Sequence, residues 1–200
     1  MILAVEGVDG AGKNTLVTAL SQQLGAERVS FPRYSESLPA HLAQEALHGR
    51  MGDLTDSAYA MATLFALDRA GAREQLLSYA GSPDKVIILD RYVASNAAYS
   101  WARTGDEGIV EWVADLEFSQ MGLPKPDLHV LLATAPEEAR RRAQRREATD
   151  NRQRDRYEKD AGLQDRTFAA YQTLARRNWM SQWVETSNPD EVAARLAEIR

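Results

Sequence analysis

The sequence predicts an α/β fold in which a mostly parallel, buried sheet is covered by helices on both faces. Short apolar runs of strand length alternate with helix-length segments along the 200 residues, and this alternation is typical of parallel sheets. The first apolar run is followed at once by a glycine-rich turn and a helix, which is a common opening of such domains. Length and pattern together predict one domain over residues 1–200.

The expected elements follow from these runs in chain order. Strands are predicted at residues 2–5, 29–31, 86–89, 128–133 and, more weakly, 180–184. Helices are predicted at residues 15–24, 56–79, 92–103, 107–121, 136–146, 155–177 and 189–199. Neither an internal repeat nor an interdomain linker interrupts this order.

The segment 56–79 stands out because it has few helix breakers before Gly71 and a plausible N-cap in Asp56. Its first three turns are apolar nearly all round, so more than one face must be covered. Burial inside one domain and a subunit interface explain this pattern equally well.

Composition excludes several classes of protein. The chain has no cysteine, which removes disulfides, thiolate metal sites and cysteine nucleophiles. A net charge of −5 opposes non-specific binding to nucleic acid or to an anionic membrane. No apolar run is long enough to span a bilayer, and no cationic leader precedes residues 2–5. We therefore expect a cytoplasmic protein with no nucleic-acid or membrane partner.

Residues 7–13 read Gly-Val-Asp-Gly-Ala-Gly-Lys, which satisfies the G-x-x-x-x-G-K pattern of a phosphate-binding loop. The alternative, a glycine turn with an incidental lysine, is disfavoured because the loop lies between a strand and a helix N-terminus, where the helix dipole also favours anions. We expect the loop and the first helical residues to hold nucleotide phosphates: Gly7, Asp9, Gly10, Ala11, Gly12, Lys13, Asn14 and Thr15.

One position departs from the general pattern. Asn14 follows Lys13, where a serine or threonine usually holds Mg²⁺ through its hydroxyl group. Either Thr15 takes over this role, or carboxylates hold the metal together with phosphate oxygens, with Asp9 and Asp90 as candidates.

A second charged cluster, Asp90-Arg91, comes directly after the apolar run 86–89. The carboxyl ends of strands in an open α/β sheet are where ligands bind. Asp90 is therefore suited to Mg²⁺ and Arg91 to bidentate contact with a phosphate. A surface Asp–Arg pair capping the next helix is the simpler alternative.

These motifs, in this order, resemble those of bacterial thymidylate kinases. The resembling segments are the phosphate loop, Phe31-Pro32-Arg33-Tyr34, Leu67-Asp68-Arg69, Asp90-Arg91-Tyr92 with Ser95, Asn96 and Tyr99, and a later basic segment, over about residues 1–170. The resemblance implies a three-layer P-loop NTPase fold with a five-stranded parallel sheet and an arginine-rich lid. It also implies a homodimer that transfers the γ-phosphoryl group of ATP to dTMP, with Mg²⁺ as cofactor.

The resemblance further assigns the base-reading residues. It implies that Phe65 stacks on thymine, Arg69 bonds O4, Asn96 faces the N3–H and O4 edge, and Tyr99 excludes a ribose 2′-OH. Phe65 and Arg69 are four residues apart, and Asn96 and Tyr99 three, so each pair can share a helix face. Without the family, ordinary packing would explain Phe65 and Tyr99, and solvent exposure would explain Asn96.

The remaining acceptor contacts are also implied by resemblance alone. The set expected around the dTMP phosphate and sugar is Asp9, Phe31, Tyr34, Arg91, Asp155 and Tyr157, with Arg33 a less certain neighbour. Asp9 resembles the residue that contacts the sugar 3′-OH and helps to arrange the metal, and Glu158 is a further candidate for the metal.

A basic segment lies between Arg140 and Arg156, where eight arginines stand against three acids. The phosphate loop has no arginine, so a kinase of this family must supply its catalytic arginine from a lid, here about residues 143–155. The candidates are Arg142, Arg145 and Arg152, in that order. A solvated helix whose arginines pair with nearby glutamates is the simpler alternative for at least half of the eight.

The sequence thus predicts a dTMP kinase in which Lys13, Asp9, Arg91, Arg142 and Arg145 promote phosphoryl transfer. Another kinase on the same scaffold is the next alternative, although the Arg69–Asn96 pair and Arg91 disfavour a nucleoside acceptor. A P-loop protein that binds nucleotide without transfer, and an RNA-binding arginine segment, are less consistent with the lid and with the net charge.

Overall fold

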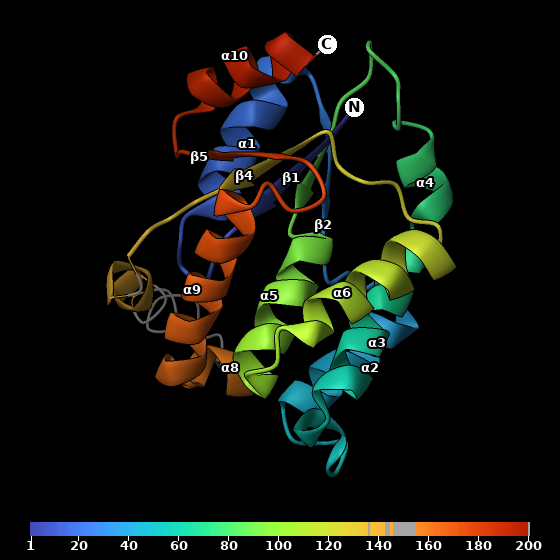
Figure 1. Ribbon diagram of the computed structural model, residues 1–200, viewed down its shortest axis with the longest axis vertical. Helices are drawn as coiled ribbons and strands as arrows, with labels where there is room; N and C mark the ends of the chain where they lie inside the picture. Colours follow the sequence, from blue (N-terminus) through green and yellow to red (C-terminus); the bar gives the residue numbers. More distant parts are fainter. Residues whose placement is uncertain (136, 143–144, 146–154, 200) are drawn as a thin grey trace.

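The computed structural model describes residues 1–135, 137–142, 145 and 155–199. Its centre is a five-stranded sheet with the strand order β2-β3-β1-β4-β5, in which each adjacent pair is parallel (Figure 1). The strands are β1 (Ile2–Glu6), β2 (Glu27–Ser30), β3 (Ile87–Asp90), β4 (Leu128–Leu131) and β5 (Gln182–Glu185). The predicted fold class and all five strands are confirmed, with boundaries that move by one or two residues.

The three central strands contain the apolar runs from which the sheet is predicted. Every residue of β1 and β4 is buried, as expected for parallel strands covered on both faces. The edge strands β2 and β5 are partly exposed instead, with Glu27 and Glu185 open to solvent. Their weaker apolar signal therefore reflects their edge positions.

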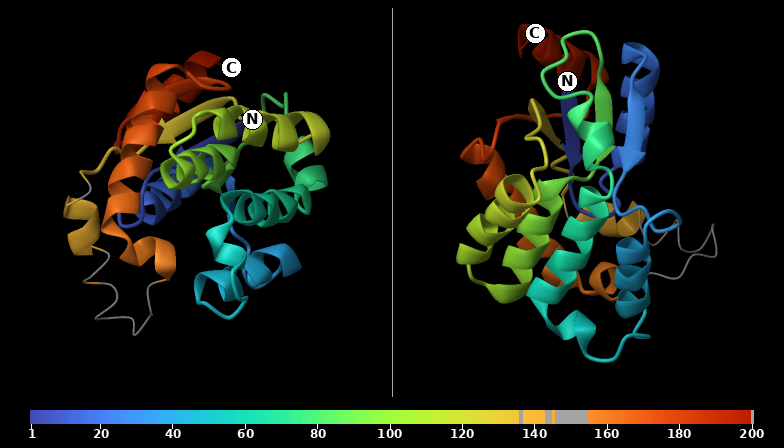
Figure 2. Two further views of the ribbon diagram at one scale, coloured as in Figure 1. Left: turned by 60° about the horizontal axis from the view of Figure 1, so that its bottom comes forward. Right: turned by 90° about the vertical axis from the view of Figure 1, so that its right-hand side faces the viewer.

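Helices cover both faces of the sheet and so form the outer two of three layers (Figure 2). The helices α5, α6 and α9 lie on one face, and α1 lies on the other with α10 against it. Their bounds are α1 Lys13–Leu24, α2 Leu38–Leu47, α3 Ala58–Ala70, α4 Arg73–Leu77, α5 Val93–Thr104, α6 Gly108–Ala114, α8 Arg156–Lys159, α9 Ala161–Arg176 and α10 Pro189–Ile199. Among the described residues, no helix is both long and apolar enough to cross a membrane.

The predicted long helix over 56–79 is wrong. A 3₁₀-turn at Leu54–Asp56 precedes α3, and the N-cap is Ser57, whose Oγ accepts a hydrogen bond from the Ala60 N–H at 3.1 Å. The helix ends at Ala70, and α4 begins only after Gly71. Serine is as good a cap as aspartate, so composition could not decide between the two neighbours.

Further differences concern where helices begin and end, and one helix that was missed. The predicted helix 155–177 is divided at Asp160, whose carboxylate caps α9 at the Leu163 N–H. The predicted helix 107–121 continues beyond α6 as a π-helix at Asp115–Gln120. Helix α2 was not predicted, although Ser37 caps it and a proline follows in its first turn. Of the predicted helix 136–146, residues 137–142 and 145 are helical, and the rest lie outside the described residues.

One titratable side chain, that of His129, is buried inside the sheet away from both cavities. His129 on β4 is fully buried and stacks on Trp183 of β5, with ring centroids 4.3 Å apart. Its Nδ1 lies 2.8 Å from Ser181 Oγ, and its Nε2 has no hydrogen-bond partner among the described residues. Burial lowers the pKa of His129 from 6.5 to about 3, so the imidazole is neutral in the folded protein at neutral pH.

This histidine predicts a specific loss of stability in acid. Below about pH 6.5 the unfolded chain protonates His129 while the folded chain does not, so the free energy of unfolding falls with a slope that approaches about 1.4 kcal/mol per pH unit until about pH 3. We expect His129→Phe to flatten this slope, measured by denaturant unfolding between these pH values. Equal slopes in both proteins would contradict the assignment.

Candidate active site

The carboxyl ends of the central strands meet at one edge of the sheet. The register pairs Val5 with Asp90 and Glu6 with Leu131, so the phosphate loop after β1 and the Asp90-Arg91 segment after β3 leave the sheet side by side. The sequence expectation that these two motifs share a ligand-binding edge is therefore met by the topology.

The phosphate loop folds tightly against the segment after β4. Gly10 has a φ of 84°, and a Cβ atom there would lie 2.1 Å from the carbonyl oxygen of Ala139, so this position requires glycine. Gly12 lines a cavity of about 580 Å³ together with the first three residues of α1, namely Lys13, Asn14 and Thr15. The Ala11 N–H is used inside the loop, where it donates to the Val8 carbonyl at 3.2 Å.

Lys13 is buried at the start of α1. Its Nζ donates to the carbonyl groups of Gly7 at 3.0 Å and Val8 at 2.9 Å. Burial and the charge of Arg91 lower the pKa of Lys13 to about 8, against the attraction of Asp9. The ammonium group therefore lies inside the loop, where phosphate oxygens would relieve its desolvation.

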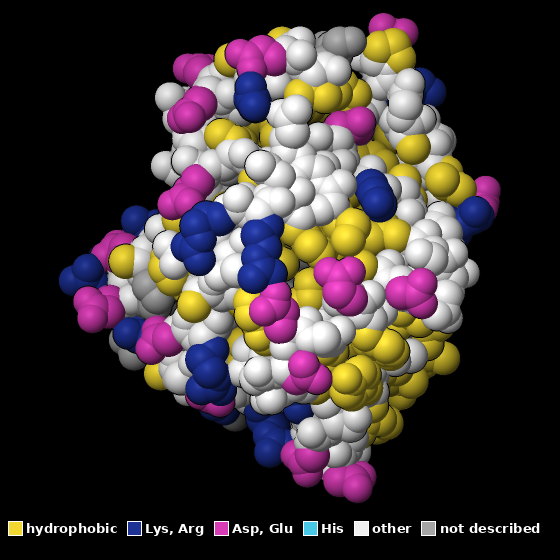
Figure 3. All heavy atoms as spheres, in the orientation of Figure 1, with side chains coloured by type: hydrophobic (Ala, Val, Ile, Leu, Met, Phe, Trp, Pro, Cys, Tyr) yellow, Lys and Arg dark blue, Asp and Glu magenta, His cyan; other side chains and the backbone are white. Residues whose placement is uncertain are grey.

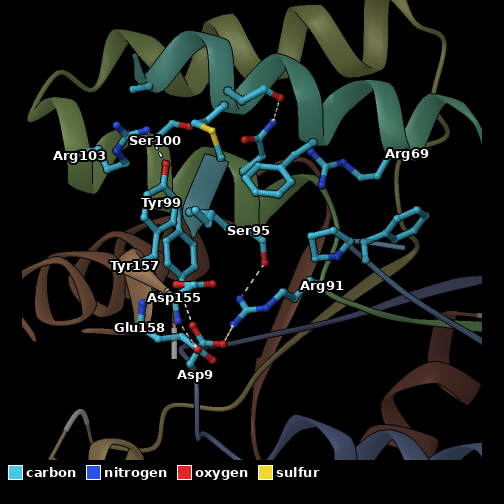
Figure 4. Close-up of a pocket in the computed structure, with 18 of the residues that line it drawn as sticks. Asp9, Arg69, Arg91, Ser95, Tyr99, Ser100, Arg103, Asp155, Tyr157 and Glu158 are labelled. Carbon is cyan, nitrogen blue, oxygen red and sulfur yellow. Dashed lines mark hydrogen bonds and ion pairs between the residues drawn. The ribbon is translucent and has the colours of Figure 1, made fainter. Parts of the chain in front are cut away.

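Arg91 connects the loop to the helices over the sheet (Figure 4). Its φ of 68° places a non-glycine residue in the left-handed region, a strain of about 1–3 kcal/mol that is typical of functional positions. The guanidinium donates to Asp9 Oδ1 at 2.6 Å, Ser95 Oγ at 3.2 Å and Tyr171 Oη at 3.3 Å. Although burial opposes ionisation, Arg91 and Lys13 hold the pKa of Asp9 well below its usual range.

A buried carboxylate supports this arginine. Glu6, the last residue of β1, is fully buried and accepts hydrogen bonds from the Tyr92 N–H at 2.8 Å, Ser95 Oγ at 2.6 Å and Tyr171 Oη at 3.2 Å. Burial raises the pKa of Glu6. The residue thus orders the same hydroxyl groups that hold Arg91.

The residues predicted for the acceptor line one cavity of about 190 Å³ between α3, α5 and α8. In Figure 4, Asp9, Asp155 and Glu158 lie at one end of this cavity and Arg69 at the other. The complete predicted set lines it, namely Asp9, Phe31, Tyr34, Phe65, Arg69, Arg91, Asn96, Tyr99, Asp155 and Tyr157. The less certain Arg33 is not among the lining residues; its Nε bonds Asp68 at 3.0 Å.

The end of the cavity near Arg69 is built on a buried ion pair. Arg69 is 3% exposed and its Nη2 donates to Glu117 Oε1 at 2.7 Å, while its Nε donates to Oε2. Asn96 Nδ2 donates to the same carboxylate at 2.8 Å and to the Ala62 carbonyl at 3.0 Å. Two predicted base-reading residues are thus held by a carboxylate that the sequence did not single out.

Aromatic contacts join α8 to α5 beside the cavity. Tyr157 stacks on Tyr99 with ring centroids 6.1 Å apart, and the Tyr99 hydroxyl donates to Asp9 Oδ2 at 3.0 Å. Arg103 donates to Tyr157 Oη at 2.5 Å and to the Thr55 carbonyl. Helix α8 is itself fixed by a capping box in which Asp155 and Glu158 bond one another's backbone N–H groups.

The oxygen groups predicted to hold a metal line the phosphate-loop cavity. Asp9, Asp90 and Glu158 line it together with Lys13 and Thr15. Within the described ranges, no three His, Cys, Asp or Glu side chains are arranged to hold a metal ion by themselves. This donor set fits Mg²⁺, which usually takes one or two carboxylates and completes its shell with phosphate oxygens and water.

Two of the three predicted lid arginines are described. Arg142 and Arg145 line the phosphate-loop cavity, and the Nε of Arg142 also bonds Glu138 at 2.9 Å. Both the predicted role of these arginines and the simpler pairing with a glutamate are thus compatible with the structure. Arg152 lies outside the described residues, as does most of the predicted lid.

Among the described polar residues that sequence reasoning missed are Glu6, Glu117, Tyr171 and Arg103. Two of them carried a signal: Glu6 is an acid that ends a buried apolar strand, and Glu117 continues the apolar stripe of Val110 and Val113 at helical spacing. An acid at a core position indicates a buried partner. Tyr171 had no such signal, because a tyrosine on a helix face is ordinary core.

A five-stranded parallel sheet with a phosphate loop at the carboxyl ends of its strands defines a P-loop protein. The adjoining second cavity, which Arg91 also lines, suits the phosphate of a second substrate. Comparisons with known proteins specify the family. The family model for thymidylate kinase matches residues 5–196. The thymidylate kinase of Mycobacterium tuberculosis is 50% identical over 98% of this chain and 97% of that protein, and a probable thymidylate kinase of Thermococcus onnurineus is 31% identical over 88% and 85%.

The chain belongs to the thymidylate kinase family and is an ATP-dependent kinase of dTMP in nucleotide biosynthesis. A solved thymidylate kinase from Candida albicans shares the fold, with a TM-score of 0.70 and 24% identity over 99% of this chain and 89% of that one.

The pKa of Lys13 predicts how ATP binding depends on pH. Only protonated Lys13 can form an ion pair with a phosphate of ATP. Because Lys13 in the ATP-free protein loses its proton near pH 8, the affinity for ATP is expected to fall about tenfold between about pH 7 and pH 9. Titration calorimetry without acceptor measures this. Lys13→Arg, which stays charged, should give weaker but pH-independent binding, and a parallel decline in both proteins would contradict the assignment.

Proposed function

We propose that phosphoryl transfer takes place where the two cavities meet, with ATP phosphates on the loop and dTMP between α3, α5 and α8. The observation that carries this proposal is that four residues line both cavities: Asp9, Phe31, Arg91 and Glu158. Two phosphorylated ligands seated in these cavities approach one another at Asp9 and Arg91. Phosphoryl transfer requires mainly such in-line positioning and neutralisation of charge.

Cationic groups surround this meeting point. Lys13 contacts the transferred phosphoryl group from the loop, and Arg91 contacts the acceptor phosphate, exchanging part of its pairing with Asp9. Arg142 and Arg145 approach from the side of the lid, with Arg152 as a further candidate. An arginine that contacts the transition state is worth about 10³–10⁵ in rate.

Asp9, Asp90 and Glu158 are proposed to hold Mg²⁺ together with the phosphates, without the hydroxyl group that Asn14 lacks. When bound, Mg²⁺ neutralises charge on the β- and γ-phosphates. Asp9 also orients the acceptor sugar through its place beside Tyr99. Its low pKa supports a role as a fixed carboxylate rather than as a base.

The base of dTMP is proposed to lie between Phe65 and the Arg69–Asn96 pair, with Tyr99 beside the sugar. Phe65 is half-buried and lines the cavity, so its ring is available for stacking. Tyr34, Asp155 and Tyr157 complete the side of the cavity nearer the sugar and phosphate.

The first test is ADP release from Mg-ATP with dTMP, dUMP, dCMP, dGMP or thymidine as acceptor. Because the site offers arginines to an acceptor phosphate and an amide to the base, we expect rapid turnover with dTMP, weaker turnover with dUMP and little with the others. Omitting Mg²⁺ or adding a chelator should abolish turnover. Equal turnover with thymidine would contradict the role of Arg91, and preference for another base would contradict those of Phe65, Arg69 and Asn96.

We also propose a cytoplasmic homodimer in which each chain forms one domain with a lid at about residues 143–155. Hydrophobic side chains gather on the surface over α3 and α6 (Figure 3). On α3, Tyr59 is 45% exposed and Leu67 43% exposed, and Tyr59 packs edge-on against Trp112 of α6 at 4.8 Å. One face of α3 is therefore buried in the chain and another is left for a partner copy.

A charge on this face should separate the subunits. Leu67→Glu is expected to convert a dimer into a monomer in sedimentation velocity, because a buried carboxylate without a partner costs several kcal/mol at an interface. Gln22→Glu on the exposed face of α1, beyond the opposite side of the sheet, serves as the control. A wild-type monomer, or a Leu67→Glu dimer of unchanged affinity, would contradict the proposal.

A further inference from the structure

We propose that Glu117 is a positioning residue that sets the hydrogen-bonding polarity of the base-reading surface. It fixes Asn96 and Arg69 so that the cavity accepts a base with an N3–H donor and a C4 carbonyl and rejects one with an N3 acceptor and a C4 amino group. This inference rests on the proposed function, because it requires the base to lie against Asn96 and Arg69.

The carboxylate of Glu117 is fully buried and used on both oxygens. Oε1 accepts hydrogen bonds from Arg69 Nη2 at 2.7 Å and from Asn96 Nδ2 at 2.8 Å, and Oε2 accepts one from Arg69 Nε. One carboxylate thus holds both side chains at once. A buried acid with these partners constrains orientation in a way that a flexible surface pair does not.

The contacts of Asn96 fix which way its amide points. A primary amide has two N–H donors, and in Asn96 both are used, one by Glu117 and one by the Ala62 carbonyl at 3.0 Å. Rotating the amide by half a turn would place its oxygen against two acceptors. The amide oxygen is therefore the group that Asn96 offers to a ligand in the cavity, and it suits an N3–H donor.

Arg69 offers the opposite polarity. Its Nε and one Nη2 hydrogen are taken by Glu117, while Arg69 lines the cavity and its guanidinium carries only donors. Its remaining N–H groups suit a carbonyl oxygen. An acceptor on Asn96 beside donors on Arg69 matches the N3–H and C4=O edge, and both contacts become repulsive with an N3 acceptor and an amino group.

The backbone around Glu117 is adapted to this task. It lies in the π-helix Asp115–Gln120, where the Met121 N–H bonds the Leu116 carbonyl at 3.0 Å instead of the carbonyl four residues earlier. Such wide turns are rare in proteins, and those that do occur are often found at functional sites. Stability alone gives little reason for the arrangement, because a buried ion pair is often no more stable than apolar residues of similar size.

The test is Glu117→Gln, assayed by ADP release with dTMP and dCMP. Glutamine keeps the shape of the side chain but replaces one acceptor oxygen with an NH₂ donor. The Asn96 amide is then no longer held with its NH₂ group toward position 117 and its oxygen toward the cavity. We expect the ratio of kcat/KM for dTMP to that for dCMP to fall about 10–100-fold, mainly through a higher KM for dTMP. Affinity for ATP, which binds in the other cavity, should remain within about twofold.

Asp115→Asn is the matched control, since it makes the same chemical change on the exposed side of the same π-helix. It should leave the ratio unchanged. If Glu117→Gln does not fold, Glu117→Asp keeps the charge but retracts the carboxylate, and it must lower the ratio in the same direction.

The outcomes separate this inference from the function on which it rests. A uniform loss with both acceptors, or an unchanged ratio in the folded variants, overturns the role of Glu117 while leaving dTMP as the substrate. Wild-type protein that does not prefer dTMP over dCMP overturns the proposed placement of the base, and the role of Glu117 with it.

Discussion

The ion pair between Asp9 and Arg91 is the interaction on which the site depends, because it joins the phosphate loop to the helices that surround the acceptor. Asp9 comes from the turn after β1, and Arg91 from the turn after β3, and the 2.6 Å contact holds the two turns together. Around it, Glu6, Ser95 and Tyr171 form a buried network that fixes the direction of Arg91. A parallel sheet with aligned carboxyl ends makes this arrangement possible.

Charge is distributed so that an acidic chain still receives anionic substrates. The net charge of −5 coexists with Lys13, Arg91, Arg142 and Arg145 along the phosphate-loop cavity. Several of these cations already face a carboxylate or a carbonyl group inside the protein. The site is therefore preorganised, so little reorientation is required when phosphates replace these partners.

Much of the fold could be predicted from sequence because its signals are local. Apolar runs identify central strands such as β1, and the loop of residues 7–13 identifies the phosphate cavity. Helix ends depend on competition between neighbouring caps, as with Asp56 and Ser57, and were misplaced. Family resemblance supplied the residues that line the acceptor cavity. The positions of Glu6 and Glu117 indicate buried acids, but their partners could not be predicted, because those of Glu117 lie 21 and 48 residues away.

The contact between Gly10 and Ala139 has a mechanical consequence. The Ala139 carbonyl occupies the space that a side chain at position 10 would fill, so the helical segment 137–142 packs directly against the phosphate loop. Arg142 is three residues from this contact, less than one helical turn. A side chain at position 10 would therefore push this segment away from the phosphate loop, and with it the turn that carries Arg142.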